Sequence, residues 1–306
     1  MTTVNVYFAG IPAKNSNMEK VQVLKSFALG VTKNLDAVVK EVADMKYTTS
    51  DVAVIQGWVH EHSQSAPHLN FRKTIIDGQR KAGKRVIAID SNLFLYKDPG
   101  NTKTYLRFSF DGIFPTTGEY FDSVVDKGHW QEIKSNIGFD LKPWRTDGNH
   151  ILICLQRNGG WSMQGLDVMD WCVKTILEIK KYSNRPIIVR AHPGDKNAKN
   201  YLKLNVPDVK ISTNQNILDD FKTAWATITY NSSPGVASAI EGIPVFVTDP
   251  FPENSQSLKV CNTSLKDIEN PIMPERQDWI ERIAMSHWSF KDLESGKAWS
   301  HIKKFL

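Results

Sequence analysis

Short apolar runs alternate with longer amphipathic segments along almost the whole chain, and this alternation limits the possible folds more than any other feature. Residues 4–8, 51–55 and 85–90 predict strands, whereas residues 18–29 and 71–82 predict helices that end at Gly30 and Gly83. Strands and helices in this order form βαβ units around a parallel sheet. The sequence therefore predicts an α/β fold.

A second series of the same kind follows a break in the pattern. Residues 108–149 are rich in Gly, Pro, Asp and Trp, and residues 141–148 predict a linker. Beyond them we expect strands at 150–155, 186–190, 226–230 and 244–248, and helices at 165–180 and 234–241. The simplest interpretation is two Rossmann-like domains that face a cleft, 1–147 and 148–285, with a C-terminal helical tail, 286–306, that crosses back over the first domain.

Composition excludes several classes of protein. The three cysteines, Cys154, Cys172 and Cys261, lack metal-ligand spacing and argue against a disulfide framework. The N-terminus has no signal-peptide pattern, and no apolar run approaches the roughly 20 residues that span a bilayer. We therefore expect a cytoplasmic protein (in the host cytoplasm if it is viral) with no integral membrane part.

The first polar loop that follows a strand of the second series is glycine-rich. In parallel α/β sheets, ligands bind beyond the carboxyl ends of the strands. Arg157 offers a planar cation for phosphate, and Asn158, Gly159 and Gly160 allow close backbone approach. The spacing is neither GxGxxG nor Walker A, so a plain glycine-rich turn explains it equally well.

The next loop carries a histidine directly after a strand, in Arg190-Ala191-His192-Pro193. Its ring could donate a hydrogen bond to a ligand phosphate or act as a general acid. The alternative is a histidine that only structures its own loop.

The third loop contains Asn231, Ser232, Ser233, Pro234 and Gly235. Pro234 suits the first turn of a helix, and the hydroxyl groups with free backbone N–H groups would form a phosphate cradle. N-capping alone would account for one serine, but not for both serines and the asparagine.

These motifs carry a resemblance to known families. The pair His192-Pro193 and Ser232-Ser233, about 40 residues apart, resembles the His-Pro and Ser-Ser motifs of bacterial GT-B sialyltransferases. Residues 231–245 are similar to the capsule-polysaccharide transferase family, although Ser238 stands where that family commonly carries a glutamate. The resemblance implies a GT-B fold and a histidine and hydroxyl pair that contact the phosphate of a nucleotide sugar. We expect that nucleotide sugar to be UDP-linked.

The sequences of residues 151–162, 189–195 and 286–299 also resemble segments of proteins from T-even-type bacteriophages. Those phages decorate hydroxymethylated cytosines in their DNA with glucose or arabinose through GT-B enzymes. This resemblance implies a double-stranded DNA acceptor that carries 5-hydroxymethylcytosine. A net charge of +5 and a pI of about 8.9 suit such a polyanion, although a dedicated nucleic-acid-binding domain is more basic.

The first half would then hold the acceptor. Asp111 and His60 are candidates for the catalytic base, with His192 as the third catalytic residue, and Trp58, His62 and Arg107 are candidates for acceptor binding. Phe94, Tyr96 and Trp130 are further side chains able to stack on an extruded base. Asp111-Gly112 resembles the Asp-Gly of the sialyltransferase catalytic-base motif without its preceding acidic residue, and a turn residue is the alternative.

The sequence favours a metal-independent glycosyltransferase that uses a nucleotide sugar as co-substrate and needs no cofactor. His60-Glu61-His62 is not HExxH, and no Asp-x-Asp element occurs. The acceptor is predicted to be hydroxymethylcytosine in phage DNA, with a capsule or surface polysaccharide as the alternative. An NAD-linked Rossmann enzyme is disfavoured because residues 9–12 lack GxGxxG, and a non-catalytic nucleic-acid-binding protein is disfavoured by the two-domain pattern.

Overall fold

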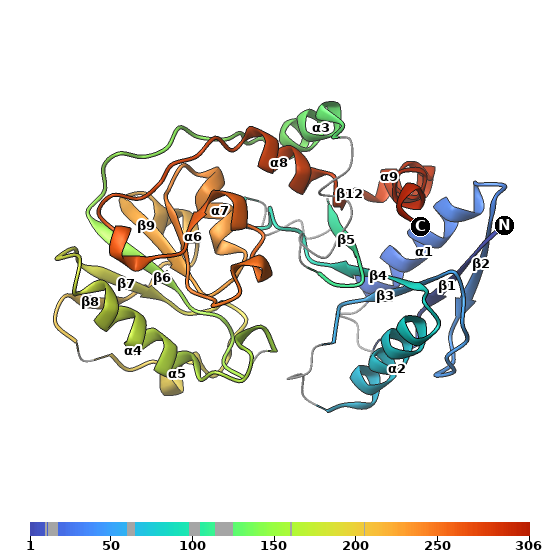
Figure 1. Ribbon diagram of the computed structural model, residues 1–306, viewed down its shortest axis with the longest axis horizontal. Coiled ribbons are helices and arrows are strands. Elements are labelled where there is room, and N and C mark those ends of the chain that lie inside the picture. The colour runs from blue at the N-terminus through green and yellow to red at the C-terminus, as the bar shows by residue number, and fades with distance from the viewer. Residues whose placement is uncertain are drawn as a thin grey trace. The chain divides into compact units, whose positions relative to one another are not determined.

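The computed structural model describes residues 1–9, 11, 18–59, 65–97, 105–113, 125–159, 161–204 and 206–306, without the side chains of residues 18, 19 and 161. The chain folds into two compact units (Figure 1). The first unit comprises Met1–Trp130 and Arg282–Leu306, and the second comprises Gln131–Glu281. The predicted limits of independently folding domains, 1–147, 148–285 and 286–306, stay a prediction.

The first unit is built on a six-stranded sheet in the order β12-β5-β4-β3-β1-β2. Neighbouring strands from β4 to β2 pair in parallel, whereas β5 is antiparallel to both of its neighbours. The strands are β1 (Thr2–Tyr7), β2 (Ala37–Val42), β3 (Val52–Gln56), β4 (Arg85–Asp90), β5 (Leu106–Phe110) and β12 (His287–Trp288). The helices that pack on this sheet include α1 (Met18–Thr32) and α2 (Pro67–Lys81).

The C-terminal segment completes the first unit, as the predicted crossing-back tail requires. Its helices are α9 (Phe290–Ser295) and α10 (Lys297–Ile302), and a short 3-10 turn, η8 (Lys303–Phe305), follows them. Leu293, Trp299 and Ile302 are buried in the same apolar core as the inner face of α1. The chain passes from one unit to the other within two further helices, α3 (Lys127–Ile137) and α8 (Gln277–Ala284).

Gly30 shows why α1 and the C-terminal segment can meet. We expected this glycine to end the first helix, but α1 continues through it to Thr32. A Cβ at Gly30 would lie 1.8 Å from the carbonyl oxygen of Leu293 in α9. The residue therefore permits close backbone contact between two helices, and the prediction of a helix end was wrong. Gly83, by contrast, has a φ of +64° just beyond α2, as expected of a glycine that ends a helix.

The second unit has a fully parallel six-stranded sheet in the order β11-β10-β9-β6-β7-β8. Counted within the unit, this is the doubly wound order 6-5-4-1-2-3 of a Rossmann fold. The strands are β6 (His150–Cys154), β7 (Ile187–Arg190), β8 (Val209–Ile211), β9 (Ala224–Thr229), β10 (Val245–Val247) and β11 (Cys261–Asn262). The helices are α4 (Val168–Ile179), α5 (Ala198–Tyr201), α6 (Ile217–Phe221) and α7 (Pro234–Ile240), with 3-10 turns η4 (Trp161–Met163), η5 (Pro252–Asn254), η6 (Leu258–Val260) and η7 (Leu265–Asp267).

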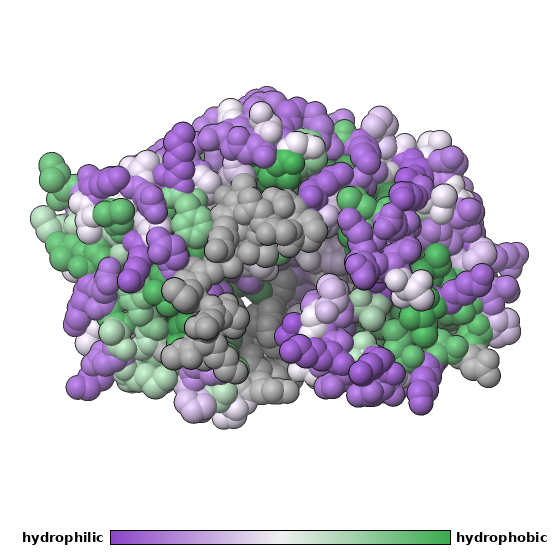
Figure 2. Space-filling model, turned by 180° about the vertical axis from the view of Figure 1, so that it is seen from behind, coloured by the Kyte–Doolittle hydropathy of each residue, from purple (hydrophilic) through white to green (hydrophobic). Residues whose placement is uncertain are grey.

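Each unit has its own apolar core, which confirms the predicted α/β fold with two Rossmann-like halves. Every residue of β6 and β9 is buried, as expected of central strands covered on both faces. On the face drawn in Figure 2, hydrophilic residues cover much of the surface and hydrophobic residues show in smaller patches. Within the described ranges, no helix combines the length and apolar character needed to cross a membrane.

Candidate functional site

The second sheet places its predicted polar loops at one edge. β6 lies between β7 and β9, so the chain leaves β6 toward one side of the sheet and later returns on the other. The loops that follow β6 and β9 therefore meet at a topological switch point, where doubly wound sheets bind ligands. Arg157 follows β6, His192 follows β7 and Ser232 follows β9.

Arg157 and His192 lie side by side at this edge. A Cβ built on Gly194 would be 2.5 Å from Nη2 of Arg157 and 3.1 Å from Cε1 of His192. The guanidinium and the imidazole therefore flank the same glycine, and any larger residue there would push them apart. Arg157 is exposed, and it forms no ion pair with a carboxylate in the described part of the chain.

The proton position on His192 follows from its own loop. The backbone N–H of Gly194 donates to Nδ1 of His192 at 2.9 Å, so Nδ1 is the acceptor and the neutral ring carries its proton on Nε2. Burial, and next the charge of Arg157, lowers the pKa of His192, while Asp195 acts in the opposite direction. The ring is thus a neutral hydrogen-bond donor through Nε2 near pH 7.

Asp195 fixes the two loops to each other. Its Oδ2 accepts a hydrogen bond from the backbone N–H of Asn158 at 3.0 Å and from the hydroxyl of Tyr201 at 2.5 Å, and its Oδ1 accepts from the N–H of Asn197 at 3.0 Å. Burial opposes its ionisation, but the hydrogen bonds from Tyr201 and these amides prevail and hold the pKa of Asp195 below its usual value. Because Asn158 follows Arg157 directly, this carboxylate holds Arg157 beside His192.

Asn231 joins the loops after β6, β9 and β10. Its backbone N–H donates to Oε1 of Gln156 at 3.1 Å, and its side-chain amide donates to Oδ2 of Asp249 at 2.7 Å and to the carbonyl of Ser162 at 3.2 Å. Asn231, Gln156 and Asp249 are all buried. The side-chain N–H groups of Asn231 therefore hold the scaffold together, and any contact it makes with a nucleotide would use other atoms.

The serine pair behaves differently from the expected cap. Ser233 precedes α7 with helical φ and ψ of −57° and −26°, and its side chain makes no capping hydrogen bond, because a capping residue needs extended backbone angles. Oγ of Ser232 is buried and has no hydrogen-bond partner among the described residues. Pro234 stands in the first turn of α7, as predicted, and Gly235 lets this helix approach Oγ of Ser257, which a Cβ would meet at 2.9 Å.

Four other predicted residues belong to these loops. Asn158 accepts from the N–H of Gly159 at 3.0 Å, and Gly159 has a φ of +69° with open space around its Cα. Pro193 is exposed beside His192, and Gly160 lies outside the described residues.

Arg190 is engaged inside the second unit. It donates to Asp220 at 2.5 Å and to the carbonyls of Asn214 and Gln215 at 2.9 and 2.6 Å. Asp220 is itself bound by the hydroxyl of Ser212 and the side chain of Asn214. Arg190 thus secures the loop after β8. These contacts do not support its predicted role in nucleotide binding.

Asp111 lies at the opposite edge of the first sheet from the one we expected. β5 runs antiparallel to β4, so its end faces the start of β4, where Asp111 accepts from the N–H of Val86 at 2.8 Å and pairs with Nε of Arg85 at 2.5 Å. Its φ is +54°. The expectation of a catalytic base assumed a loop beyond the carboxyl end of a parallel strand, and that premise was wrong. The geometry gives Asp111 a structural role.

The other predicted acceptor residues are only partly described. Arg107 is 6% exposed and donates to Asp90 at 3.0 Å, and Trp58 is half-buried against the core on the α2 side of the sheet. His60 and His62 lie outside the described residues. Phe94 and Trp130 are fully buried, so they cannot stack on an extruded base, and Tyr96 is half-buried.

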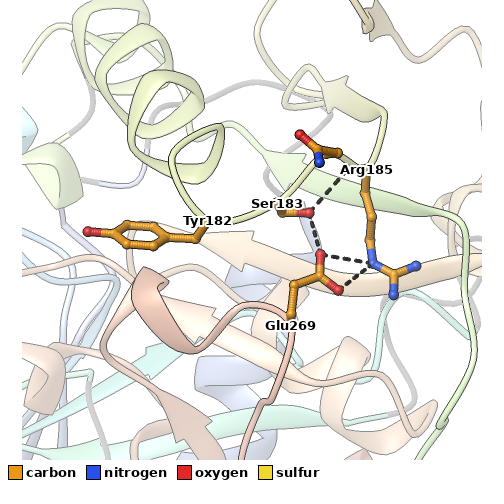
Figure 3. Close-up of a pocket in the computed structure, with 5 residues that line it drawn as sticks. Tyr182, Ser183, Arg185 and Glu269 are labelled. Carbon is orange, nitrogen blue, oxygen red and sulfur yellow. Dashed lines mark hydrogen bonds and ion pairs between the residues drawn. The ribbon is translucent and has the colours of Figure 1, made fainter.

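A pocket at the opposite end of the second sheet has its charges already satisfied (Figure 3). Arg185 donates to both carboxylate oxygens of Glu269 at 3.2 and 3.1 Å, and the hydroxyl of Ser183 donates to the same carboxylate. The guanidinium also lies 4.4 Å from the ring centroid of Trp225. Because Arg185 precedes β7, this pocket is at the amino ends of the strands, away from the edge where ligands bind.

Two further observations bear on other chemistry. All three cysteines are buried and free, and burial raises the pKa of Cys154 to about 12, so this thiol is a packing group, as expected. Across the residues that the structure describes, no group of three or more His, Cys, Asp or Glu side chains is arranged to hold a metal ion.

Sequence reasoning missed the residues that hold this edge together, namely Gln156, Gly194, Asp195, Tyr201 and Asp249. Asp195 and Gly194 follow the His-Pro pair directly, so a short-range turn pattern could have indicated them. Gln156, Tyr201 and Asp249 meet their partners only after the loops have come together, and no local signal marks them.

Comparison with known proteins supports the fold. No protein-family model matches the chain, and no curated protein matches it. The KpsC β-Kdo 2,4-transferase of Thermosulfurimonas dismutans has a similar structure, with a TM-score of 0.55 and 12% identity over 94% of this chain and 91% of that one. The KpsC β-Kdo 2,7-transferase of the same organism gives 0.54 and 14% over 92% and 89%. At this identity the likeness concerns architecture alone, and the chain has the two Rossmann-like domains of the GT-B fold.

Proposed function

We propose that the chain is a glycosyltransferase whose nucleotide-sugar donor binds at the carboxyl edge of the second sheet. The observation that carries the proposal is the arrangement of Arg157 and His192 around Gly194, at the switch point of a doubly wound sheet. Ser232, whose buried Oγ has no partner in the described part of the chain, follows the adjacent strand. The bond between Gln156 and Asn231 holds these loops together.

This arrangement suits the charge that develops when a sugar leaves its nucleotide. The leaving phosphate gains negative charge, and preorganised donors stabilise it without reorganisation. Arg157 supplies a fixed positive charge, His192 supplies the N–H of Nε2, and Ser232 supplies a hydroxyl. These protein groups would neutralise the phosphate directly, so we propose a transferase that needs no divalent metal.

The acceptor that we now place first is a saccharide hydroxyl. The two KpsC proteins with a similar fold are Kdo transferases. The DNA acceptor rested on aromatic and basic side chains of the first half, and burial of Phe94, Trp130 and Arg107 removes three of them from reach. Hydroxymethylcytosine in DNA remains the second candidate, because Trp58 and Tyr96 are partly exposed.

Mass spectrometry of acceptors tests the function. The protein would be incubated with UDP- and CMP-linked sugars and, in separate reactions, with capsule-type oligosaccharides and hydroxymethylcytosine duplex DNA. We expect a mass increase of one sugar on an oligosaccharide, lost in Arg157→Gln. Sugar on the DNA alone would reverse the order of the two acceptors, and no transfer to either from any donor would contradict the proposal.

A further inference from the structure

Among the described residues at the carboxyl edge of the first sheet, two arginines lie near one carboxylate. In this sheet β1 lies between β2 and β3, so the switch point is beside the ends of β1 and β3. The loop after β3 begins at Gly57, and a Cβ there would lie 3.1 Å from Nη1 of Arg72. Arg72 belongs to α2, which packs against β3 and β4 (Figure 1). Its guanidinium lies next to Gly57, the first residue of that loop.

Among the described residues, Asp90 is the carboxylate whose charge acts on both Arg72 and Arg107, and it forms an ion pair with Arg107. Nη2 of Arg107 donates to Oδ2 of Asp90 at 3.0 Å, at the end of β4, while Oδ1 of Asp90 accepts from the N–H of Ser91. Arg107 is 6% exposed, and its Nε and Nη1 have no hydrogen-bond partner among the described residues. Asp90 is therefore already committed, and Arg72 forms no hydrogen bond or ion pair in the described chain.

The electrostatics of the neighbouring groups agree with an excess of positive charge. Burial lowers the pKa of both Arg72 and Arg107, and Asp90 only partly opposes this. Burial, and next the charges of Arg72 and Lys20, lowers the pKa of His68. Buried cations in proteins are normally paired with anions, and among the described residues Arg72 has no anion bonded to it.

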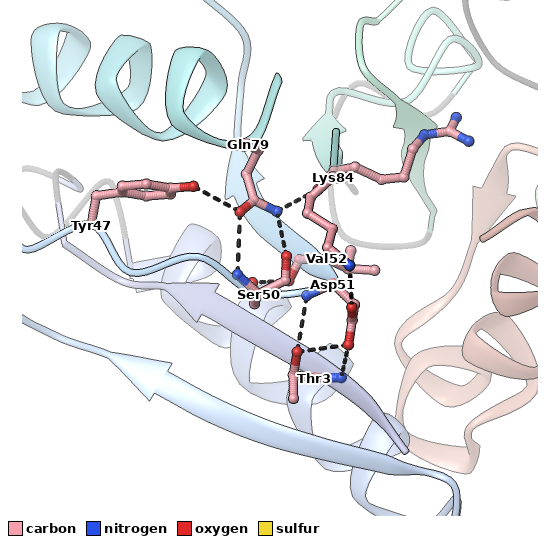
Figure 4. A network of polar contacts seen from close by, with 8 residues as sticks. Thr3, Tyr47, Ser50, Asp51, Val52, Gln79 and Lys84 are labelled. Carbon is pink, nitrogen blue, oxygen red and sulfur yellow. Dashed lines mark hydrogen bonds and ion pairs between the residues drawn. The ribbon is translucent and has the colours of Figure 1, made fainter. Parts of the chain in front are cut away.

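The amino-end edge of the same sheet shows the usual balance (Figure 4). There Asp51 accepts from Nζ of Lys84 at 2.7 Å and from the amide and hydroxyl of Thr3 at 2.9 and 2.8 Å. The side chain of Gln79 is bonded to Ser50, Tyr47 and the carbonyl of Arg85. The charged groups of that network are bonded to each other, whereas Arg72 at the carboxyl edge forms no hydrogen bond or ion pair with any described residue.

We propose that Arg72 binds an anionic group, a carboxylate or phosphate, on the acceptor saccharide, and that Arg107 holds Asp90 away from it. This inference rests on the proposed function, because it assigns the first unit to the acceptor. A guanidinium fork binds such a group through two parallel hydrogen bonds. DNA is less suitable, since proteins bind its backbone through many exposed Lys and Arg side chains, and this site offers one half-buried cation.

Binding measurements with matched anionic and neutral sugars test the inference. Tetragalacturonate would be compared with maltotetraose, and glucose-6-phosphate with glucose, by isothermal titration into the whole protein. We expect the anionic member of at least one pair to bind, and its affinity to fall about 10- to 100-fold in Arg72→Gln, the size of one lost charge-assisted hydrogen-bonded contact. Loss with the first pair identifies a carboxylate, and loss with the second identifies a phosphate.

Controls separate this inference from the proposed function. Arg80→Gln removes an exposed arginine from the last turn of the same helix and should leave every affinity unchanged. UDP and CMP affinities should be equal in Arg72→Gln and the wild type, because the donor site is in the other unit. If neither nucleotide binds but the anionic sugar does so through Arg72, the proposed function fails and the anion site stands. Equal binding of anionic and neutral sugars, no effect of Arg72→Gln, or an effect on hydroxymethylated DNA alone would overturn the inference.

Discussion

The carboxyl edges of the two sheets differ in how their charges are arranged. In the second unit, Asp195 and Asp249 accept hydrogen bonds from loop amides and side chains. Neither carboxylate pairs with Arg157, and the Nε2 proton of His192 has no acceptor among the described residues. In the first unit, the carboxylate of Asp90 pairs with the buried Arg107, and Arg72 has no ion pair with any described residue. We therefore propose a phosphate site built from several loops at the second edge, and at the first edge a single cation for one anionic group.

The largest expected effect is the loss of His192. We expect His192→Ala to lower sugar transfer by about 100-fold or more, the size of one lost charge-stabilising donor. Transfer rates at saturating donor would measure it, with Arg80→Gln as a control at an exposed site. Unchanged rates in a folded His192→Ala protein would remove this residue from the site.

Gly194→Ala should come next, because it moves the two groups apart without deleting either. The added Cβ would lie 2.5 Å from Nη2 of Arg157, so this side chain must shift. We expect nucleotide affinity to fall about 10-fold, in the range of one lost charged hydrogen bond. Gly128→Ala is the control, since its nearest neighbour is the side chain of Asp126 in the first unit. Equal affinity in Gly194→Ala and wild type would show that the contact between Arg157 and His192 does not matter.

Acid should weaken the first unit through His287, which is buried, and His301, which is half-buried. Burial lowers the pKa of His287 to about 3 and that of His301 to about 4, whereas an unfolded histidine has a pKa near 6.5. Below about pH 6.5 the unfolded chain therefore binds more protons than the folded chain. The free energy of unfolding falls as the pH is lowered from there toward the pKa values of the folded state, by at most about 1.4 kcal/mol per pH unit for each histidine. Urea unfolding at pH 7 and pH 5 measures this. A flat response, or the same slope in His287→Gln, would contradict it.

Asp111→Asn should have a small effect on stability and none on transfer. Asparagine tolerates the positive φ of Asp111 but loses the ion pair with Arg85, which is partly exposed. We expect a loss of about 1 kcal/mol in unfolding free energy and a transfer rate within about twofold of wild type. A drop in rate of 100-fold in a stable protein would restore Asp111 as the catalytic base.

The smallest expected effect is that of metal removal. Because Arg157, His192 and Ser232 are proposed to stabilise the phosphate directly, EDTA should leave transfer unchanged. Complete loss of activity with EDTA, restored by Mn²⁺ or Mg²⁺, would reveal a metal site.

The sequence predicted the fold better than the site because strand periodicity is local. Buried runs such as those of β6 and β9 were clear, but β2 alternates between exposed and half-buried residues at the sheet edge and was missed. Gly30 was misread because its partner, Leu293, is distant in the sequence. The antiparallel direction of β5 could not be inferred from its composition, and this moved Asp111 to the wrong edge.

The loops of the second unit were found because polar residues directly follow apolar runs. The residues that support these loops were not found, because their partners lie in other loops: Asp195 accepts from the backbone N–H of Asn158, and Asp249 accepts from the side chain of Asn231. Arg72 carried no signal at all, since an arginine inside an amphipathic helix usually faces solvent. Its proposed role depends on its position next to Gly57, at the start of the loop after β3.

Nucleotide titration tests most directly whether the second unit binds a nucleotide-sugar donor. UDP, CMP and NAD would each be titrated calorimetrically into the wild type, Arg157→Gln and Arg72→Gln. We expect that UDP or CMP binds, that NAD does not, and that nucleotide affinity falls about 10-fold or more in Arg157→Gln and stays unchanged in Arg72→Gln. Binding of NAD alone, no binding of either UDP or CMP, or equal affinity in Arg157→Gln and wild type would contradict it.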